Sequence, residues 1–200
     1  MDVREIKKNV IAMADKMCDM VDLVSRGFME HKPEFLTGAM KIESEINAME
    51  KTVTQSVLGL SKGMKNGKDR KELIAFQQAV EMLERMGDEA ASLVERIEMK
   101  NAEHLLFSET GVEQFNETYN AMRKSVEMMR DFLKGKGSGT KERIIDNGFH
   151  VKALVERYRQ EHTDRLVRGI CTPIAANMYF DMLDFTGNLA RHSSSIAKLF

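Results

Sequence analysis

The stretch MLERMGDEA at residues 82–90 recurs 100 positions later as MLDFTGNLA at residues 182–190. Both copies keep their apolar positions, one acid, the central glycine and the final alanine in step. A repeat at half the chain length is typical of a duplicated helical bundle and not of a small stacking unit. We therefore expect two similar halves, which can be compared residue by residue.

Apolar residues recur at three- and four-residue steps along six segments, the pattern of helices that bury one face. The first segment covers residues 3–30, the second follows Pro33, and the third ends near His104. Ser108 is the expected N-cap of the fourth, and the fifth covers residues 141–168. Thr172 and Pro173 are expected to open the sixth.

Helices of about 25 to 30 residues are roughly 40 Å long, which suits elongated bundles better than a globin-like packing. The sequence thus predicts an all-α protein of six long helices, arranged as two pseudo-symmetric three-helix bundles. We place the first bundle at residues 1–107 and the second at residues 108–200. No linker rich in proline or serine separates them, so we expect the two to pack as one unit.

Composition narrows the range of partners and compartments. The formal net charge of the 200 residues is -1, which gives no reason to expect binding to nucleic acid. The first 20 residues are too charged for a signal peptide, and no apolar run approaches the ~20 residues that span a bilayer. Cys18 and Cys171 form no close motif, which favours a reducing compartment. We expect the protein in the cytoplasm.

Two acidic pairs on neighbouring segments suggest a metal site. Glu84 and Asp88 are four residues apart, so both carboxylates point to one side of a helix, and Glu43 and Asn47 repeat this spacing on the preceding helix. Carboxylate and amide oxygens suit hard cations and iron. The same spacing is also common on a solvated helix face, and this alternative stays open.

Other residues that could carry chemistry have simpler interpretations. His162 and His192 lie on apolar stripes, where a buried histidine bonded to a neighbouring helix is more common than a metal ligand or a proton relay. No nucleophile, base and oxyanion set is visible, so we expect no enzyme. A basic cluster near the turn after the second helix suits either anionic lipid or plain solvation: Lys62, Lys65, Lys68, Arg70 and Lys71.

Gly87 and Gly187 lie at equivalent positions inside the predicted helices, where glycine lowers helix stability by about 1 kcal/mol relative to alanine. We therefore expect a neighbouring helix to approach closely at both. Six methionines at helical spacing suit the core or a pliable partner surface, and the core is the more common role: Met13, Met17, Met20, Met122, Met128 and Met129.

The stretch LERMGDEA at residues 83–90 is similar to the Leu-Glu-Arg-Ile-Gly-Asp-His-Ala signature of PhoU-like proteins, regulators of bacterial phosphate uptake. IESEIN at residues 42–47 resembles a segment of that family's second helix. HTDRLVRGICTP at residues 162–173 resembles the PhoU-like modules associated with sodium/phosphate cotransporters. The resemblance implies six helices in two repeats, a cytoplasmic regulatory role, and metal clusters held by the acidic pairs.

The chain departs from the family pattern where metal would bind. Asn47 stands where the family has Asp, and the second half has Gly148, Lys152 and Asn188 in place of acidic residues. A lysine there repels a cation. We therefore expect at most one metal site, in the first half, made by Glu43, Asn47, Glu84 and Asp88 and taking iron, zinc, manganese or magnesium.

The resemblance implies a non-enzymatic regulator of phosphate transport or phosphate signalling, which acts by protein contact. Its expected partner is a membrane phosphate transporter or a sensor kinase, and a homodimer or membrane association through a partner is compatible with this role. Two alternatives remain. The chain could be a metal-binding module whose cation carries the signal, or a metal-free structural bundle.

Overall fold

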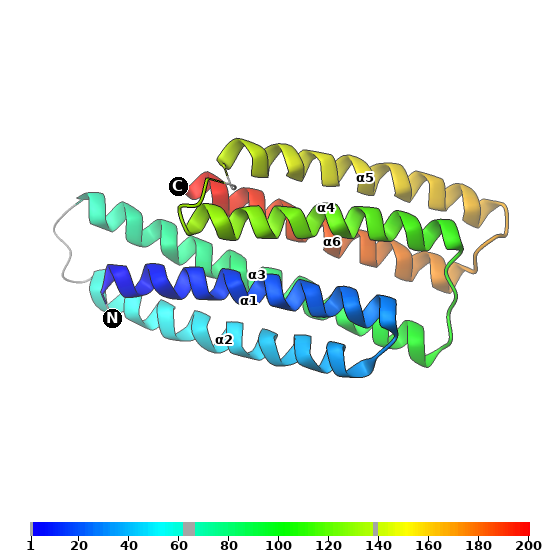
Figure 1. The fold of residues 1–200 in the computed structure, drawn as a ribbon, viewed down its shortest axis with the longest axis horizontal. Helices are drawn as coiled ribbons and strands as arrows, with labels where there is room; N and C mark the ends of the chain where they lie inside the picture. The colour runs from blue at the N-terminus through cyan, green and yellow to red at the C-terminus, as the bar shows by residue number, and fades with distance from the viewer. Residues whose placement is uncertain (1, 62–66, 138–139) are drawn as a thin grey trace.

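A computed structural model of the chain describes residues 2–61, 67–137 and 140–200. The described residues form helices and no strand, as predicted, and the helices are α1 (Val3–Glu30), α2 (Pro33–Ser61), α3 (Gly67–Ala102), α4 (Glu109–Leu133), α5 (Lys141–Val167) and α6 (Pro173–Leu199). They lie nearly side by side in an elongated molecule (Figure 1). The all-α prediction is confirmed.

Local chemistry fixes the helix ends. The Ser108 hydroxyl accepts a hydrogen bond from the Gly111 N–H at 3.1 Å, and Thr172 caps α6 in the same way. Gly169, directly after α5, has φ +71° and so stops the helix in the left-handed region. One end was predicted too far along: α3 ends at Ala102 because His104 has φ 51°, which cannot continue a helix.

Four helices make the centre of the molecule. α1 packs on α4, and α3 packs on α6, so the first three helices meet the last three along both pairs. Among the described helices, α2 contacts only α1 and α3, and α5 contacts only α4 and α6. The two outer helices therefore flank the centre on opposite sides (Figure 1). The domain boundary predicted between residues 107 and 108 falls in the connection between α3 and α4 and stays a prediction.

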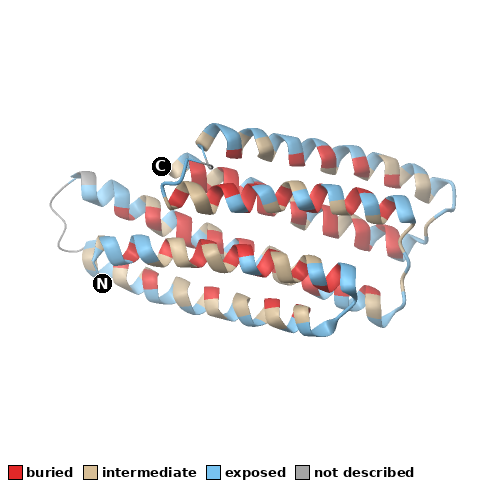
Figure 2. Ribbon diagram, in the orientation of Figure 1, coloured by how far each residue is buried: buried red, intermediate tan, exposed pale blue. Residues whose placement is uncertain are grey.

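The contact between the two halves is apolar inside and polar at its edges. Phe28 of α1 and Phe115 of α4 meet edge to face, with ring centroids 4.9 Å apart. The buried Tyr119 hydroxyl donates to the backbone carbonyl of Val21 at 2.8 Å, across the same boundary. Buried residues line the inner sides of the helices throughout (Figure 2), and the six methionines of the two runs are all among them. The core interpretation of those methionines is confirmed.

One predicted feature, the basic cluster after α2, lies partly outside the described residues. Lys62 and Lys65 are not described, and for Lys68 the side chain is not described.

The glycines mark where the outer helices approach the centre. A Cβ at Gly87 would lie 3.7 Å from Ile46 Cγ2, and one at Gly187 would lie 3.4 Å from Val155 Cγ2. The outer helices do touch at both glycines, but a methyl group fits at Gly87. A tighter approach is at Gly148 of α5, where a Cβ would lie 2.3 Å from the Ser194 Oγ. That position was not singled out by the repeat.

Gly148→Ala is expected to destabilise the protein by about 1–3 kcal/mol through overpacking. The new methyl group displaces the Ser194 hydroxyl, which donates at 3.2 Å to the carbonyls of Ile144 and Ala190. Gly87→Ala is the matched control, and we expect it to be neutral or stabilising by up to about 1 kcal/mol, as alanine favours helix. Urea unfolding followed by circular dichroism measures both, and equal stability of Gly148→Ala and the wild type would refute the contact.

Candidate functional site

The four predicted metal ligands lie on one face, between α2 and α3. Asn47 Nδ2 donates to Glu43 Oε1 at 2.5 Å, so these two side chains meet on α2. Burial raises the pKa of Glu84 on α3, and the negative charges of Asp88, Glu50 and Glu43 raise it further. These carboxylates are thus close enough to repel one another, and they make this face acidic.

The donor set on the acidic face fits a hard cation in part. Asn47 Oδ1 is buried and has no hydrogen-bond partner among the described residues, so one carbonyl oxygen is free to bind a ligand. Carboxylate and carbonyl oxygens are the ligands that such cations prefer. However, no group of three or more His, Cys, Asp or Glu side chains is placed to hold a metal in the part of the chain that the structure describes. Asp88 is exposed. The face offers oxygen ligands without a closed coordination shell.

Glu50 belongs to this face and was missed from the sequence. Its charge raises the pKa of Glu84, and its carboxylate accepts a hydrogen bond from the Thr54 hydroxyl at 2.7 Å. Glu50 lies seven residues after Glu43, which is two helical turns, so the spacing could have revealed it.

The equivalent face of the second half, between α5 and α6, is a groove of about 400 Å³. Gly148 and Lys152 of α5 and Asp184 and Asn188 of α6 all line it. Asp184 is paired with Arg159, and Asn188 donates to Glu89 on α3 at 3.0 Å. With a lysine and no free carboxylate pair, these residues do not fit a metal ion.

The polar contacts of the two buried histidines differ from the prediction. Each was expected to bond to a neighbouring helix. The His162 Nδ1 instead lies 3.0 Å from Arg165 on its own helix, while its ring stacks on Tyr179 of α6 with centroids 4.2 Å apart. His192 contacts the adjacent Arg191.

Burial, then the neighbouring arginines, lowers the pKa of each histidine to about 4. Both rings are therefore neutral near pH 7, and neither is suited to store a proton there.

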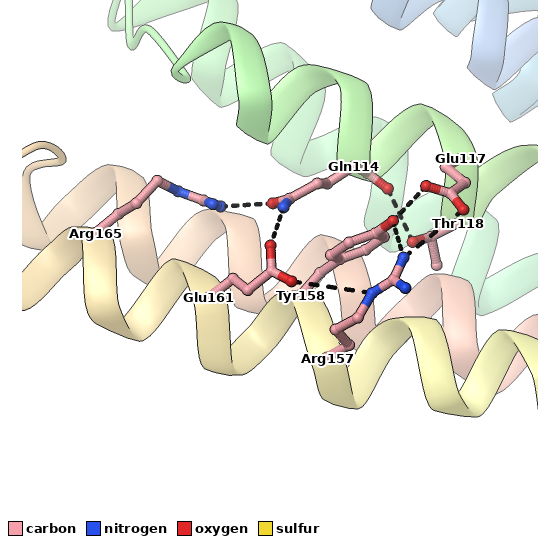
Figure 3. A network of polar contacts seen from close by, with 7 residues as sticks. All are labelled: Gln114, Glu117, Thr118, Arg157, Tyr158, Glu161 and Arg165. Atoms are coloured by element: carbon pink, nitrogen blue, oxygen red, sulfur yellow. Dashed lines mark hydrogen bonds and ion pairs between the residues drawn. The ribbon is translucent and has the colours of Figure 1, made fainter.

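A polar network ties α4 to α5 (Figure 3). Arg165 donates to Gln114 Oε1 at 2.8 Å, and Gln114 donates in turn to Glu161. Further along the same helices, the Tyr158 hydroxyl donates to Glu117. Each of these hydrogen bonds joins a side chain of α4 to a side chain of α5, so the network stabilises the packing of the two helices.

Large apolar side chains are exposed at one end of the molecule, where α1 turns into α2, α3 connects to α4, and α5 connects to α6 (Figure 1). We call this set the apolar end: Met29 (51% exposed), Leu106 (86%), Val167 (82%), Ile170 (59%) and Ile174 (61%). Exposed apolar residues that gather in one region mark a contact surface more often than isolated ones do.

The geometry so far defines a class: an all-α protein of two three-helix units, with an acidic face on one unit and a charged groove on the other. Residues 10–97, which include the acidic face, match the PhoU domain family. Over these residues the chain is thus similar to PhoU domains, and the predicted resemblance to the PhoU-like family is confirmed.

Solved structures extend the likeness to the whole chain. PhoU from Pseudomonas aeruginosa superposes with a TM-score of 0.89 at 16% identity, covering 98% of this chain and 93% of that one. The phosphate transport system regulatory protein PhoU from Streptococcus pneumoniae has a TM-score of 0.81 at 14% identity, covering 98% and 92%. At these identities the likeness shows the fold. No curated protein matches the sequence, and the finer resemblance of residues 162–173 to cotransporter modules stays a prediction.

Proposed function

We propose that this chain is a non-enzymatic regulator of phosphate transport or phosphate signalling, which binds a membrane phosphate transporter or a sensor kinase from the cytoplasmic side. The PhoU domain match and the PhoU fold over 98% of the chain support this role. Among the described residues no helix is long and apolar enough to cross a membrane. A role at the membrane would therefore run through a partner.

The apolar end is the observation that carries the proposal of protein contact. Five large apolar side chains in or next to three connections are exposed at this end, with Leu106 and Val167 more than four fifths exposed. Burying such a side chain contributes about 1.5–3 kcal/mol, so several together can supply the centre of an interface. The segment at residues 162–173, similar to cotransporter-associated modules, runs into the same end.

The described side chains also support a role without catalysis. Burial raises the pKa of the Cys18 thiol to about 12, so that it is not a nucleophile near pH 7. The two buried histidines have arginines, and no acid, against their ring nitrogens.

The double variant Leu106→Ser/Ile174→Ser is expected to weaken binding to the partner at least about tenfold, because each change removes apolar area from the centre of the contact. The binding partner is the phosphate transporter or sensor kinase of the same cell, purified in detergent and immobilised for interferometry. Leu58→Ser is the matched control, since Leu58 is 61% exposed but lies on α2, away from the apolar end.

Binding of wild type and Leu58→Ser with loss in the double variant would support the proposal. Undiminished binding by the double variant would assign the contact to another surface, and no binding by the wild type to either partner would contradict it. Light scattering of the free chain tests the remaining expected partner, a second copy.

A metal-dependent function is the second candidate, favoured by the unpartnered Asn47 oxygen among carboxylates that repel one another. A divalent cation such as iron, zinc, manganese or magnesium would relieve that repulsion. Glu43, Asn47, Glu84 and Asp88 would hold it, with Glu50 as a further neighbour. Binding or release of this cation would change the charge of the acidic face, and that change would be the signal.

Glu84→Ala is expected to lose bound metal, whereas the wild type and Glu95→Ala keep about one ion per chain. Glu95 is a suitable control because it is exposed on the same helix. Plasma mass spectrometry after dialysis against mixed divalent cations gives the content. Metal in all three proteins would place the site elsewhere, and metal in none would favour a metal-free regulator or a structural bundle.

A further inference from the structure

The groove between α5 and α6 has a volume of about 400 Å³. Pockets for small molecules measure about 300–1,000 Å³. The helices that form its walls are held from behind by α4, on which both pack. The groove is thus a preformed feature on a fixed support.

Cations predominate along its walls. Four basic and two acidic side chains line it, and both acids already have partners: Glu156 lies 3.6 Å from Lys152, and Asp184 pairs with Arg159. The other two cations, Arg191 and Lys198, form no ion pair with the carboxylates that the structure describes. Arg191 makes long contacts, at 3.5 Å to Asn188 and 3.3 Å to His192, and its positive charge acts to lower the pKa of Glu89 on α3 without an ion pair between them. Excess positive charge therefore remains along α6.

The repeat shows that this charge is specific to the second half. At the offset of 100 residues, Arg191 and Lys198 take the places of Ala91 and Glu98. On the outer helix, the same offset sets Lys152 against Thr52, so this lysine also has no basic counterpart in the first half. One face of the duplicated fold thus carries acids and its counterpart carries bases, so the two suit ligands of opposite charge.

The α5 wall of the groove is apolar in the part before Lys152. Phe149 of α5 lines the groove and is 65% exposed, and Ile145 lies one turn before it on the same face. Gly148, which lies between Ile145 and Phe149 in the chain, lets α5 approach Ser194 of α6. An exposed aromatic ring beside lysine and arginine side chains offers a stacking surface next to an anion site.

We propose that this groove binds a phosphate ester of nucleotide size. Its phosphate oxygens would accept hydrogen bonds from Arg191 and Lys198, while Ser195, which also lines the groove, would donate another. Its aromatic or apolar part would lie against Phe149. Free phosphate would satisfy the cations but leave the apolar wall uncovered, so it is the weaker ligand. This site goes beyond the proposed function and does not depend on it.

Calorimetric titration of the full chain with ATP, adenosine and inorganic phosphate tests the proposal. We expect ATP to bind, and each of the other two to bind at least about tenfold more weakly because it meets only one part of the groove. The affinity for ATP should fall as salt rises. No heat with ATP at millimolar concentration overturns the site, and adenosine binding as tightly as ATP overturns the anionic recognition.

Variants locate the binding. Arg191→Gln/Lys198→Gln should lower the affinity for ATP at least about tenfold, whereas Lys8→Gln/Lys51→Gln, which removes the same charge from exposed positions of the first half, should not. Phe149→Ala should weaken ATP and leave inorganic phosphate unchanged. Equal losses in both double variants would reduce the effect to net charge and overturn the groove as the site. Thermal melting checks that each variant is folded, and the partner-binding assay reports separately on regulation.

Discussion

Everything outside the centre of this molecule depends on the packing of α1, α3, α4 and α6 against one another. The buried Tyr119 hydroxyl finds its partner in the Val21 carbonyl of the other half, and leaving it unpaired in an apolar core would cost about 1–3 kcal/mol. This bond and the edge-to-face contact of Phe28 with Phe115 join α1 to α4 across the two halves. Each outer helix then rests on two helices of its own half.

Much of the fold could be predicted because its signals are local. Helix caps such as Ser108 and Thr172 act within one turn, and an apolar stripe is visible in the sequence wherever its helix lies. The signature at residues 83–90 predicted the family for the same reason, since it is one continuous segment.

The rest depends on how helices are rotated against each other, which periodicity does not encode. Asn188 stands in place of an acidic residue and lines the second-half groove, but its amide also donates to Glu89 on α3, a contact between the halves that the sequence does not show. The His162 ring stacks on Tyr179, and the approach of Gly148 to Ser194 joins segments with no sequence signal in common. Whether the acidic face holds a metal also depends on small shifts of Glu43 and Glu84 that sequence alone does not fix.

Duplication and divergence together account for the arrangement of the proposed functions. The shared fold supplies two equivalent faces, and differences such as Thr52 against Lys152 and Glu98 against Lys198 between the halves give them different charge. The apolar end lies apart from the middle of both faces, so a protein partner could bind there while a ligand occupies either face. Such separation suits a regulator that passes a ligand signal to a transporter or kinase.

Phosphate uptake in cells of the source organism that lack this chain tests the account most directly. Cells would be grown at a range of external phosphate, uptake of radiolabelled phosphate would then be measured at one fixed concentration, and the wild-type chain would be restored as the control. We predict that loss of the chain abolishes the dependence of the uptake rate on external phosphate, and that restoring the chain recovers it. An unchanged dependence in cells without the chain would contradict the regulatory role.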